Sequence, residues 1–497
     1  MTTATADTPK APSDAPLLEN YVDGAWRAAT ASDTLESRDP ATGELIATVP
    51  LSNTADVDAA VQAAKAALPQ WRATPPAVRA RAIMKLRESL AAHQDEIARL
   101  VTRDMGKTVD DAFMEVGRGI ESVEAAIGIP HLLKGENLEG VARGVDVHMV
   151  RQPVGVVAAI TPFNFPAMIP LWFLPYAIAC GNTFILKPSE QDPTPSRRII
   201  ELIDAIEEIP KGVVNLVHGA HDAVNGLLDH PDVDAISFVG SAKTARYVAT
   251  KAAENGKRVQ ALGGAKNSMV VMPDADPKLL TGGVMGSAFG AAGQRCLAGS
   301  IALLVGTKEE QDRSKDLLVN AAKELKVGAG DDPHTDVCPV VSPQARDRLV
   351  GDIENAAKEG ATVVLDGREA GAGDGGAQLA PTILDNVAGD SYAAREELFG
   401  PVLSLVRVDT LQDAIAWTNE SRYGNSAIIF TESGGAAREF RFGIGAGMIG
   451  VNVGVAAPVA WFPFAGWKDS IDGDLHANGT DAIEFYTRKK VVTERWA

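Results

Sequence analysis

The segment "GNTFILKPSEQDPTPSRRIIELIDAIEEIPKGVVNLVHG", residues 181–219, decides the fold. Its two ends, residues 181–187 and 212–219, are short apolar runs bounded by glycine and proline, which is typical of buried strands. Between them, residues 194–209 repeat apolar side chains at helical spacing. A strand, a helix and a second strand of these lengths predict a β-α-β unit on a parallel sheet.

The same alternation extends along most of the chain. It predicts strands within 145–160 and at 234–240, and helices at 55–71, 77–107, 109–128, 223–230 and 241–256. A second alternating block, from residue 268 to residue 465, includes a helix at 312–327, a strand at 362–367 and a helix at 411–420. The chain ends in a β-prone arm, residues 482–497, of the kind that pairs with another sheet or with a partner subunit. We therefore expect an α/β protein.

The composition restricts the class of protein. With 497 residues, 45% of them hydrophobic and 23% charged, the chain is long enough for two or three domains with substantial cores. A formal net charge of −18 argues against nucleic acid or an anionic membrane as a general partner. The cysteines, Cys180, Cys296 and Cys338, are far apart, which indicates neither a disulfide framework nor a thiolate zinc site.

Two further segments bear on the location of the protein. Residues 1–16 lack the apolar core of a signal peptide, and their composition is typical of a disordered tail. The longest apolar run, residues 167–181, is shorter than the roughly 20 residues of a membrane-spanning helix and contains two prolines. We therefore predict a cytoplasmic protein.

The histidines at 218, 221 and 230 have no matching ligand set, so we expect no metal site.

The stretch "FGAAGQRCLAGS", residues 289–300, surrounds Cys296 with small residues and places Arg295 directly before it. Small neighbours leave space around the sulfur, and a nearby positive charge favours the nucleophilic thiolate. An inert packing thiol is the alternative interpretation of this stretch on its own.

Four other segments place polar side chains at the ends of expected elements. In "ITPFNFP", residues 160–166, the Asn164 amide could donate to an oxyanion or cap a turn. In "KPSE", residues 187–190, Lys187 and Glu190 follow a strand where α/β folds bind nucleotides, although a solvated loop explains them equally well.

The remaining two segments are "FVGS", residues 238–241, and "EELFGP", residues 396–401. Ser241 begins a helix, whose free N–H groups suit a pyrophosphate or an ordinary N-cap. Glu397 and Phe399 precede a rigid Gly-Pro pair. Two GxGxxG matches, at 371–376 and 445–450, lack the strand-to-helix context of a dinucleotide fingerprint and are set aside.

Together and in this order, the five segments resemble the aldehyde dehydrogenase superfamily over nearly the whole chain after the tail. The resemblance implies an aldehyde dehydrogenase-like α/β fold with a Rossmann-like NAD domain, an α/β catalytic domain and a β oligomerisation arm. The implied boundaries are 17–133 and 154–263 for the NAD-binding domain, 264–466 for the catalytic domain, and 134–153 and 477–497 for the arm.

The resemblance also implies a role for each site residue. Cys296 would be the nucleophile, and Asn164 with the Cys296 backbone N–H would form the oxyanion hole. The residues expected to bind NAD are Thr161, Phe163, Lys187, Glu190, Ser241, Glu397 and Phe399.

Hydrolytic members of the superfamily carry a glutamate in a Glu-Leu-Gly-Gly stretch, where it deprotonates the attacking water. In "KRVQALGGAKNSMVVMPDAD", residues 257–276, the matching position is Ala261 or Leu262, and no Asp or Glu lies between Arg258 and Pro273. Water needs such a base. A thiol, with a pKa of about 8.5, supplies thiolate without one. The absence of a carboxylate at this position therefore predicts that the acyl group is transferred to coenzyme A.

Longer stretches, among them "FNFPAMIPLWF" and "HDAVNGLLDHPDVDAISFVGS", resemble the CoA-acylating methylmalonate-semialdehyde dehydrogenase branch. That branch oxidises methylmalonate or malonate semialdehyde to propionyl-CoA or acetyl-CoA with loss of CO2, in valine or inositol breakdown. A substrate carboxylate needs cations near the sulfur, and Arg295 fits this need. Arg118 resembles the second arginine of the branch, although its helical pattern alone places it in solvent.

The expected partners are therefore a semialdehyde with a carboxylate and coenzyme A, with no nucleic acid and no membrane, in a homo-oligomer that is a dimer or a tetramer. Two alternatives stay open. One is a hydrolytic aldehyde dehydrogenase that recruits another base and releases a free acid. The other is a non-catalytic structural protein of the same fold.

Overall fold

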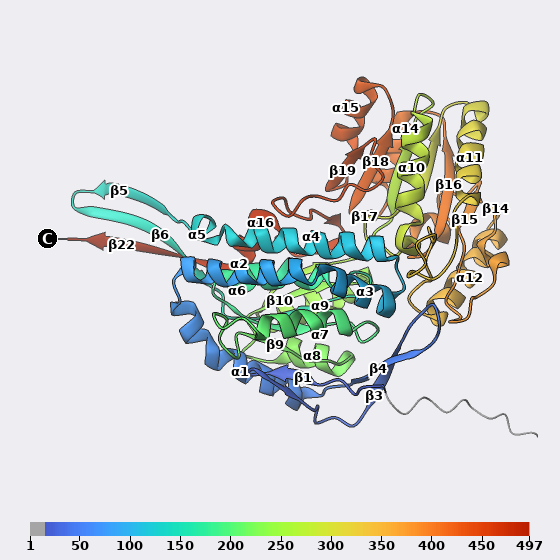
Figure 1. The fold of residues 1–497 in the computed structure, drawn as a ribbon. Coiled ribbons are helices and arrows are strands. Elements are labelled where there is room, and N and C mark those ends of the chain that lie inside the picture. The colour runs from blue at the N-terminus through green and yellow to red at the C-terminus, as the bar shows by residue number, and fades with distance from the viewer. Residues whose placement is uncertain (1–14, 497) are drawn as a thin grey trace, which may run out of the picture.

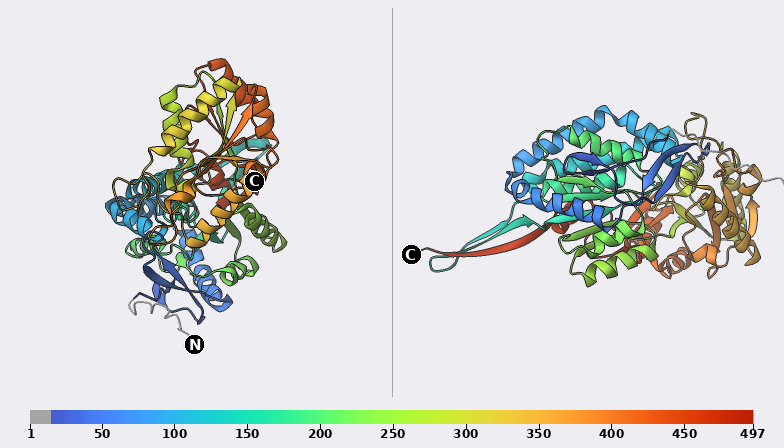
Figure 2. Two further views of the ribbon diagram at one scale, coloured as in Figure 1. Left: turned by 90° about the vertical axis from the view of Figure 1, so that its right-hand side faces the viewer. Right: turned by 90° about the horizontal axis from the view of Figure 1, so that it is seen from below.

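The computed structural model describes residues 15–496 as two α/β bodies and a projecting arm (Figures 1 and 2). Both bodies consist of a sheet flanked by helices, which confirms the predicted α/β class. The arm extends away from the first body and carries the C-terminal strand (Figure 1). Residues 1–14 of the predicted tail lie outside the described residues, while the carbonyl of Pro16 accepts a hydrogen bond from the Thr48 N–H at 3.0 Å.

The first body is built on a sheet of eight strands in the order β2-β1-β9-β8-β7-β10-β11-β21. These strands are β1 (Asn20–Val22), β2 (Ala25–Arg27), β7 (Val156–Ile160), β8 (Thr183–Lys187), β9 (Val214–Leu216), β10 (Ala235–Val239), β11 (Arg258–Leu262) and β21 (Ile471–Asp472). The central strands β7 to β11 pair in parallel. The predicted β-α-β unit is confirmed as β8, α7 (Thr194–Asp204) and β9, with the helix ending at Asp204 instead of residue 209.

Helices cover both faces of this sheet. One face packs against α1 (Thr54–Ala73), α8 (His221–Asp229) and α9 (Ala242–Glu254). The other packs against α2 (Pro76–Ala92), α4 (Val109–Ile127), α6 (Met168–Ala179) and α7, with α3 (Gln94–Met105) and α5 (Ile129–Leu132) beside them. The single helix predicted at 77–107 is wrong: the chain leaves helical geometry at His93, so α2 and α3 are separate.

The buried face of α4 is not simply its most apolar side. Of the apolar side chains that recur along it at helical spacing, Val116 and Ile120 are buried, but Phe113 is 42% exposed. The polar side chains of Glu115 and Ser122 are buried instead. This face is set by α6, which packs directly against α4. The partner helix, and not the most apolar stripe, therefore decides which side of α4 is inside.

The second body is built on a sheet of seven strands in the order β14-β15-β16-β13-β12-β18-β19. These strands are β12 (Asn267–Val271), β13 (Gly299–Val305), β14 (Thr362–Leu365), β15 (Thr382–Asp385), β16 (Val402–Val408), β18 (Ser426–Phe430) and β19 (Met448–Val451). Its helices are α10 (Pro277–Ala288), α11 (Lys308–Lys323), α12 (Pro343–Lys358), α13 (Tyr392–Arg395), α14 (Leu411–Asn419) and α15 (Gly434–Gly443). The GxGxxG match at 445–450 runs into β19 and not into a helix, as predicted.

The arm is an antiparallel sheet in the order β22-β6-β5, formed by β5 (Glu136–Ala142), β6 (Val145–Pro153) and β22 (Thr487–Arg495). The prediction of a β-prone segment over 482–497 is only partly right, since α16 (Gly479–Tyr486) precedes β22. Phe485 and Tyr486 are buried against the first body, which fixes this helix in place. The terminal strand pairs within its own chain.

Two small ribbons complete the fold: β3 (Thr34–Arg38) with β4 (Leu45–Pro50), and β17 (Tyr423–Gly424) with β20 (Trp467–Lys468). The apolar run at 167–181 is the core helix α6, all of whose residues are buried. Within residues 15–496, no helix is both long and apolar enough to cross a membrane.

Phe184 on β8 is completely buried in the core between the first sheet and α6. We expect Phe184→Ala to lower the free energy of unfolding by about 3–5 kcal/mol, because it removes apolar contacts and leaves a cavity. Phe442→Ala is the matched control, since that ring is 70% exposed. Denaturant unfolding should separate the two variants, and equal losses would contradict the assigned core.

Candidate active site

Cys296 lies at the wall of a cavity of about 370 Å³ between the two bodies. The cavity walls come from α4, from the start of α6, from the segment that carries Cys296, and from residues 455–464 and 478. Cys180 and Cys338 are buried in the cores, so Cys296 differs from them in its access to a ligand. The packing interpretation of Cys296 therefore does not hold.

The backbone before Cys296 has a left-handed conformation over three consecutive residues. Ala291 and Ala292 have φ values of 48° and 52°, and Gly293 has a φ of +70°. L-residues with a Cβ adopt this region at a cost, so the surrounding structure must hold it. A Cβ on Gly293 would lie only 2.2 Å from the carbonyl oxygen of Gly400. Glycine at position 293 is therefore required by both conformation and space.

Two asparagines that the sequence analysis missed fix the nucleophile segment. The Asn267 Nδ2 donates to the carbonyl oxygens of Cys296 and Ala298, each at 2.9 Å. The Asn425 Nδ2 donates to the same Cys296 carbonyl at 2.8 Å. Asn267 begins β12 and Asn425 precedes β18, so the second sheet sets the orientation of Cys296. Nothing in the local sequence pattern of either residue indicates this role.

Asn164 lies beside the nucleophile segment, as predicted. Its buried side chain donates from Nδ2 to the carbonyl of Gln294 at 3.0 Å. An amide nitrogen carries two N–H groups, and this contact uses one of them. The first body thus places an amide donor against the segment that carries Cys296.

The expectation that local charge makes Cys296 a thiolate is wrong for this state of the protein. Burial, and to a smaller extent the negative charge of Glu397, raise the pKa of the Cys296 thiol to about 12. Arg295 and nearby backbone N–H groups lower it, but they are weaker than the loss of solvation. At neutral pH the sulfur is therefore a thiol that must lose its proton before it attacks.

Both predicted arginines line the Cys296 cavity. Arg295 pairs with Asp111 at 2.7 Å, and Arg118 pairs with Glu121 at 2.8 Å. The solvent-facing position that the helical pattern gives Arg118 is partly right, since its side chain is 39% exposed while it also lines the cavity. The two arginines make this cavity suited to a small molecule with a carboxylate.

Ser241 and Glu397 share a second cavity, of about 590 Å³. Ser241 also caps α9 by accepting a hydrogen bond from the Thr244 N–H at 3.3 Å. The cavity further holds Lys243, Arg246 and Arg422, which sequence reasoning missed. Arg246 pairs with Asp472 at 2.7 Å and Arg422 with Glu396 at 2.6 Å, both carboxylates of the same cavity. The N-terminus of α9 and Lys243 are therefore the groups that suit a pyrophosphate.

The Glu397 carboxyl accepts a hydrogen bond from the Ala265 N–H at 3.0 Å. Burial raises the pKa of this carboxyl to about 7, against the lowering effects of Ala265 and Lys266. Phe399, two residues after Glu397, has a left-handed φ of 56°. Its ring meets that of Phe163 edge-on, with 5.8 Å between centroids. The "EELFGP" turn therefore contacts the turn that carries Asn164.

The remaining predicted cofactor residues gather at the carboxyl ends of β7 and β8. Lys187 and Glu190 form an ion pair of 3.0 Å, and the Thr161 N–H donates to the Lys187 carbonyl at 3.1 Å. Among the described residues, the buried hydroxyl of Thr161 has no hydrogen-bond partner. Within the same residues, no group of three or more His, Cys, Asp or Glu side chains is arranged to hold a metal ion.

The position that a hydrolytic base would occupy is apolar. Ala261 and Leu262, both on β11, are 0% and 4% exposed. Strand alternation places them on opposite faces of the sheet: Ala261 packs toward α9, and Leu262 joins the cluster against which Cys296 packs. Leu262 is therefore the residue on the nucleophile's side.

Comparison with known proteins identifies the family and similar relatives. The Aldehyde dehydrogenase family model matches residues 26–492. Malonate-semialdehyde dehydrogenase 2 of Geobacillus kaustophilus is 51% identical over 480 residues, which cover 96% of this chain and 99% of that protein.

Solved structures with a similar fold carry names of the same kind as the sequence relatives. A methylmalonate-semialdehyde dehydrogenase from Oceanimonas doudoroffii superposes with a TM-score of 0.94 at 44% identity, covering 97% of this chain and 99% of that one. A Sinorhizobium meliloti protein crystallised with NAD gives a TM-score of 0.95 at 44% identity, covering 98% of this chain and 99% of that one.

The left-handed turn before Cys296 gives a direct test of the site. We expect Gly293→Ala to lower the catalytic rate by about 100-fold, because the new Cβ would displace the nucleophile segment. Gly282→Ala, on α10, is the matched control, since its Cβ would meet no atom within 4 Å. If Gly293→Ala kept the rate of the Gly282→Ala variant, the turn would not position the sulfur.

Proposed function

Because the chain belongs to the aldehyde dehydrogenase family, we propose that it oxidises malonate semialdehyde or methylmalonate semialdehyde and transfers the acyl group to coenzyme A with loss of CO2. The single observation that carries this proposal is the placement of Arg118 and Arg295 on the walls of the Cys296 cavity. The relatives named as malonate-semialdehyde and methylmalonate-semialdehyde dehydrogenases support the same substrates.

In the proposed reaction, the Cys296 thiol loses its proton and the sulfur adds to the aldehyde carbon, giving a thiohemiacetal. The Asn164 amide and the Cys296 backbone N–H donate to the oxygen on which charge develops. When bound, NAD supplies the hydride acceptor for the oxidation, and a thioester on Cys296 remains. The bond from the α-carbon to the substrate carboxylate breaks to release CO2, and the α-carbon takes a proton in its place, so that the acyl group becomes acetyl or propionyl. The thiol of coenzyme A then attacks this thioester and frees the cysteine.

Several features of the second cavity support NAD as the acceptor. Lys243 and the N–H groups at the N-terminus of α9 suit two phosphates. Lys187 and Glu190 would bind the adenosine ribose, whose hydroxyls pair with a carboxylate; its charge also disfavours a 2′-phosphate. Glu397 would hold the nicotinamide ribose. Thr161, Phe163 and Phe399 border the same region.

The carboxylates around Cys296 support thiolysis over hydrolysis. Three of them line the cavity, and each pairs with a cation: Asp111 with Arg295, Glu121 with Arg118, and Glu115 with Lys107. These ion pairs engage the carboxylate oxygens to which an attacking water would have to give its proton. Leu262 offers no base at all. Coenzyme A therefore suits this pocket better than water does.

One specific observation favours the hydrolytic alternative. The buried carboxyl of Glu397, with a pKa of about 7, is close enough to raise the pKa of Cys296. A carboxylate of that basicity is a fitting general base at neutral pH. In this second candidate function, Glu397 would activate water and the product would be a free acid.

We also propose that the protein is a homo-oligomer, a dimer or a tetramer, held together through the arm. Every residue of β5 is exposed at the edge of the arm, and Leu138 and Val141 on it are apolar. Exposed strand edges with apolar side chains pair readily with a second chain.

The eight-stranded sheet, the seven-stranded sheet and the sheet of the arm support the predicted NAD-binding, catalytic and arm units. Three free cysteines suit a reducing compartment such as the cytoplasm.

A first test measures NADH formation from malonate semialdehyde, with and without coenzyme A. We expect a burst without coenzyme A and sustained turnover only with it, because the thioester has no base to hydrolyse it. Cys296→Ser should lose the burst by at least about 1,000-fold, whereas Cys338→Ser, at a buried thiol, should keep it. Sustained release of free acid without coenzyme A would establish the hydrolytic alternative.

A second test concerns the substrate carboxylate. We expect Arg295→Met to lower kcat/KM for malonate semialdehyde by about 10- to 100-fold, because a charge-assisted hydrogen bond is lost. The value for propanal, which has no carboxylate, should change little. Arg99→Met removes an exposed ion pair on α3 and serves as the control. Equal losses for both aldehydes would mean that Arg295 does not recognise the carboxylate.

A further inference from the structure

We propose that the buried ion pair of Lys107 and Glu115 is a positioning device that holds the oxyanion donor Asn164 in place. Neither residue belongs to the site predicted from the sequence. The inference rests on the proposed function, since it assumes that Cys296 attacks and that Asn164 stabilises the oxyanion. It adds that the position of Asn164 depends on charged groups from another element.

Lys107 reaches the Asn164 turn directly. Its Nζ lies 2.6 Å from Glu115 Oε2 and donates to the main-chain carbonyl of Asn164 at 2.8 Å. The ammonium also lies over the ring of Phe165, 4.2 Å from its centroid. The side chain of Lys107 is 1% exposed and that of Glu115 is 0% exposed. Water therefore does not compete for these contacts, which makes them strong and directional.

Glu115 holds the other end of the same turn. Its second oxygen, Oε1, accepts hydrogen bonds from the N–H groups of Ala167 and Met168, at 2.9 and 3.1 Å. Met168 begins α6, and Ala167 has no side chain that could cap this helix. The first N–H groups of a helix need an acceptor. Here the acceptor comes from α4, so residues 164–168 are fixed from outside their own segment.

Glu115 lies on α4 and Lys107 lies just before that helix, which joins the pair to the substrate site. Asp111, Glu115, Arg118 and Ser122 follow one another at spacings of four, three and four, and all four line the Cys296 cavity. They form one polar face of the helix. The same helix therefore carries the support for the oxyanion donor, a cation for the substrate carboxylate, and the partner of Arg295 (α4 in Figure 1).

The charge of Lys107 has a second consequence for the cavity. Glu115 is an anion in the wall of a pocket that is suited to an anionic substrate. When Glu115 is paired with Lys107, the two charges nearly cancel, so the pair adds little to the electric field in the cavity. Without Lys107, an uncompensated buried carboxylate would repel the substrate and would no longer be held against the turn.

The test is a double-mutant cycle on the rate of the NADH burst at saturating semialdehyde, where weaker binding of the substrate by a variant does not change the rate. Lys107→Met and Glu115→Gln are each made in the unchanged protein and in the Asn164→Ala variant. In the unchanged protein we expect each to slow the burst by about 10- to 100-fold, because the oxyanion donor moves. In the Asn164→Ala background the further loss should be less than about threefold, because the group that they position is already gone.

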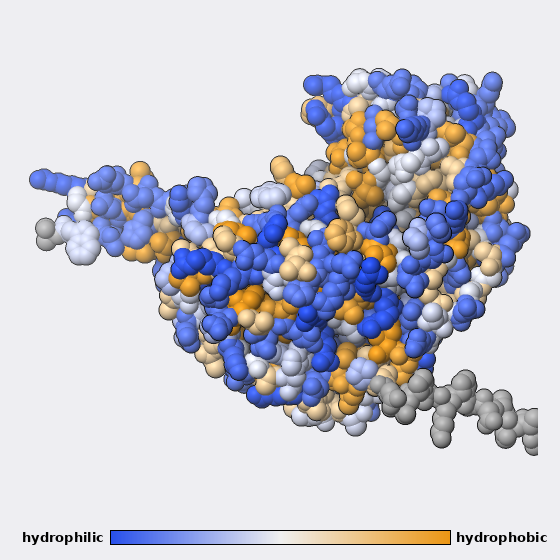
Figure 3. All heavy atoms as spheres, viewed as in Figure 1, coloured by the Kyte–Doolittle hydropathy of each residue, from blue (hydrophilic) through white to orange (hydrophobic). Residues whose placement is uncertain are grey.

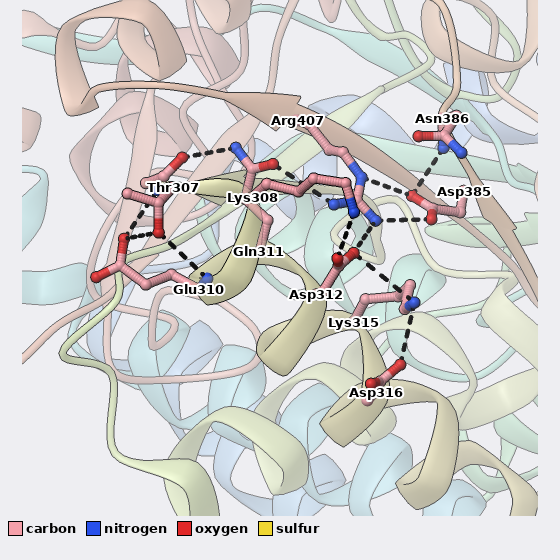
Figure 4. A network of polar contacts seen from close by, with 11 residues as sticks. Thr307, Lys308, Glu310, Gln311, Asp312, Lys315, Asp316, Asp385, Asn386 and Arg407 are labelled. Carbon is pink, nitrogen blue, oxygen red and sulfur yellow. Dashed lines mark hydrogen bonds and ion pairs between the residues drawn. The ribbon is translucent and has the colours of Figure 1, made fainter.

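Thermal unfolding separates positioning from stability. The decrease of the midpoint caused by either substitution should be the same with and without Asn164→Ala. The control is Asp385→Asn, which breaks the ion pair with Arg407, a 2.8 Å contact at the end of the second sheet opposite to Cys296 (Figure 4). It should lower the midpoint and leave the burst rate unchanged.

The outcomes are distinguishable. If the losses from Lys107→Met or Glu115→Gln multiply fully with that of Asn164→Ala, the pair acts elsewhere and the inference is wrong. If Asn164→Ala or Cys296→Ser alone leaves the burst intact, the proposed function fails first. Should Lys107→Met not fold, Glu115→Gln alone carries the cycle, because it removes the charge of the pair and keeps an amide oxygen for the N–H groups of Ala167 and Met168.

Discussion

The structure depends on how the main chain around Cys296 is held. Its carbonyl accepts hydrogen bonds from two amide side chains, Asn267 and Asn425, that belong to the second sheet. Two residues earlier, the carbonyl of Gln294 accepts a hydrogen bond from Asn164 of the first body. The strained, left-handed turn before the cysteine is stable only under such restraint. The Cys296 segment is therefore a point at which the two sheets are joined, and the two bodies form one continuous surface (Figure 3). The cavity beside Cys296 is lined by residues of both bodies.

Burial determines the protonation of the Cys296 thiol and of the Glu397 carboxyl beside it. It keeps Cys296 protonated and raises the pKa of the Glu397 carboxyl to about 7, because both ionised forms lose their solvation. The same low polarity strengthens the ion pairs on the cavity wall. Arg295 and Arg118 are held by Asp111 and Glu121 in this state, so a substrate carboxylate would exchange for a partner that is already there. The pocket thus combines a strong preference for an anion with few groups able to activate water.

Much of this could be predicted from the sequence. The alternation of apolar runs and helical periods predicted the α/β class, because burial of both faces of a parallel sheet leaves that pattern locally. The segments of Cys296, Asn164, Ser241 and Glu397 were recognised from residue types and their order. Predictions failed where a local pattern had two solutions. The segment 77–107 is two helices, and the segment before β22 is helical, because packing against the first body decides both.

By itself, then, the sequence determined the fold class, the family and the reacting cysteine, since each depends on residues that are close along the chain. Only the tertiary structure decided which face of α4 is inside, that Arg118 faces the cavity, and that Lys107, Glu115, Asn267 and Asn425 support the site. These residues are ordinary in their own segments. They acquire their roles from partners far away in the chain, and hydrogen bonds and ion pairs of that kind leave no periodic signal in a sequence.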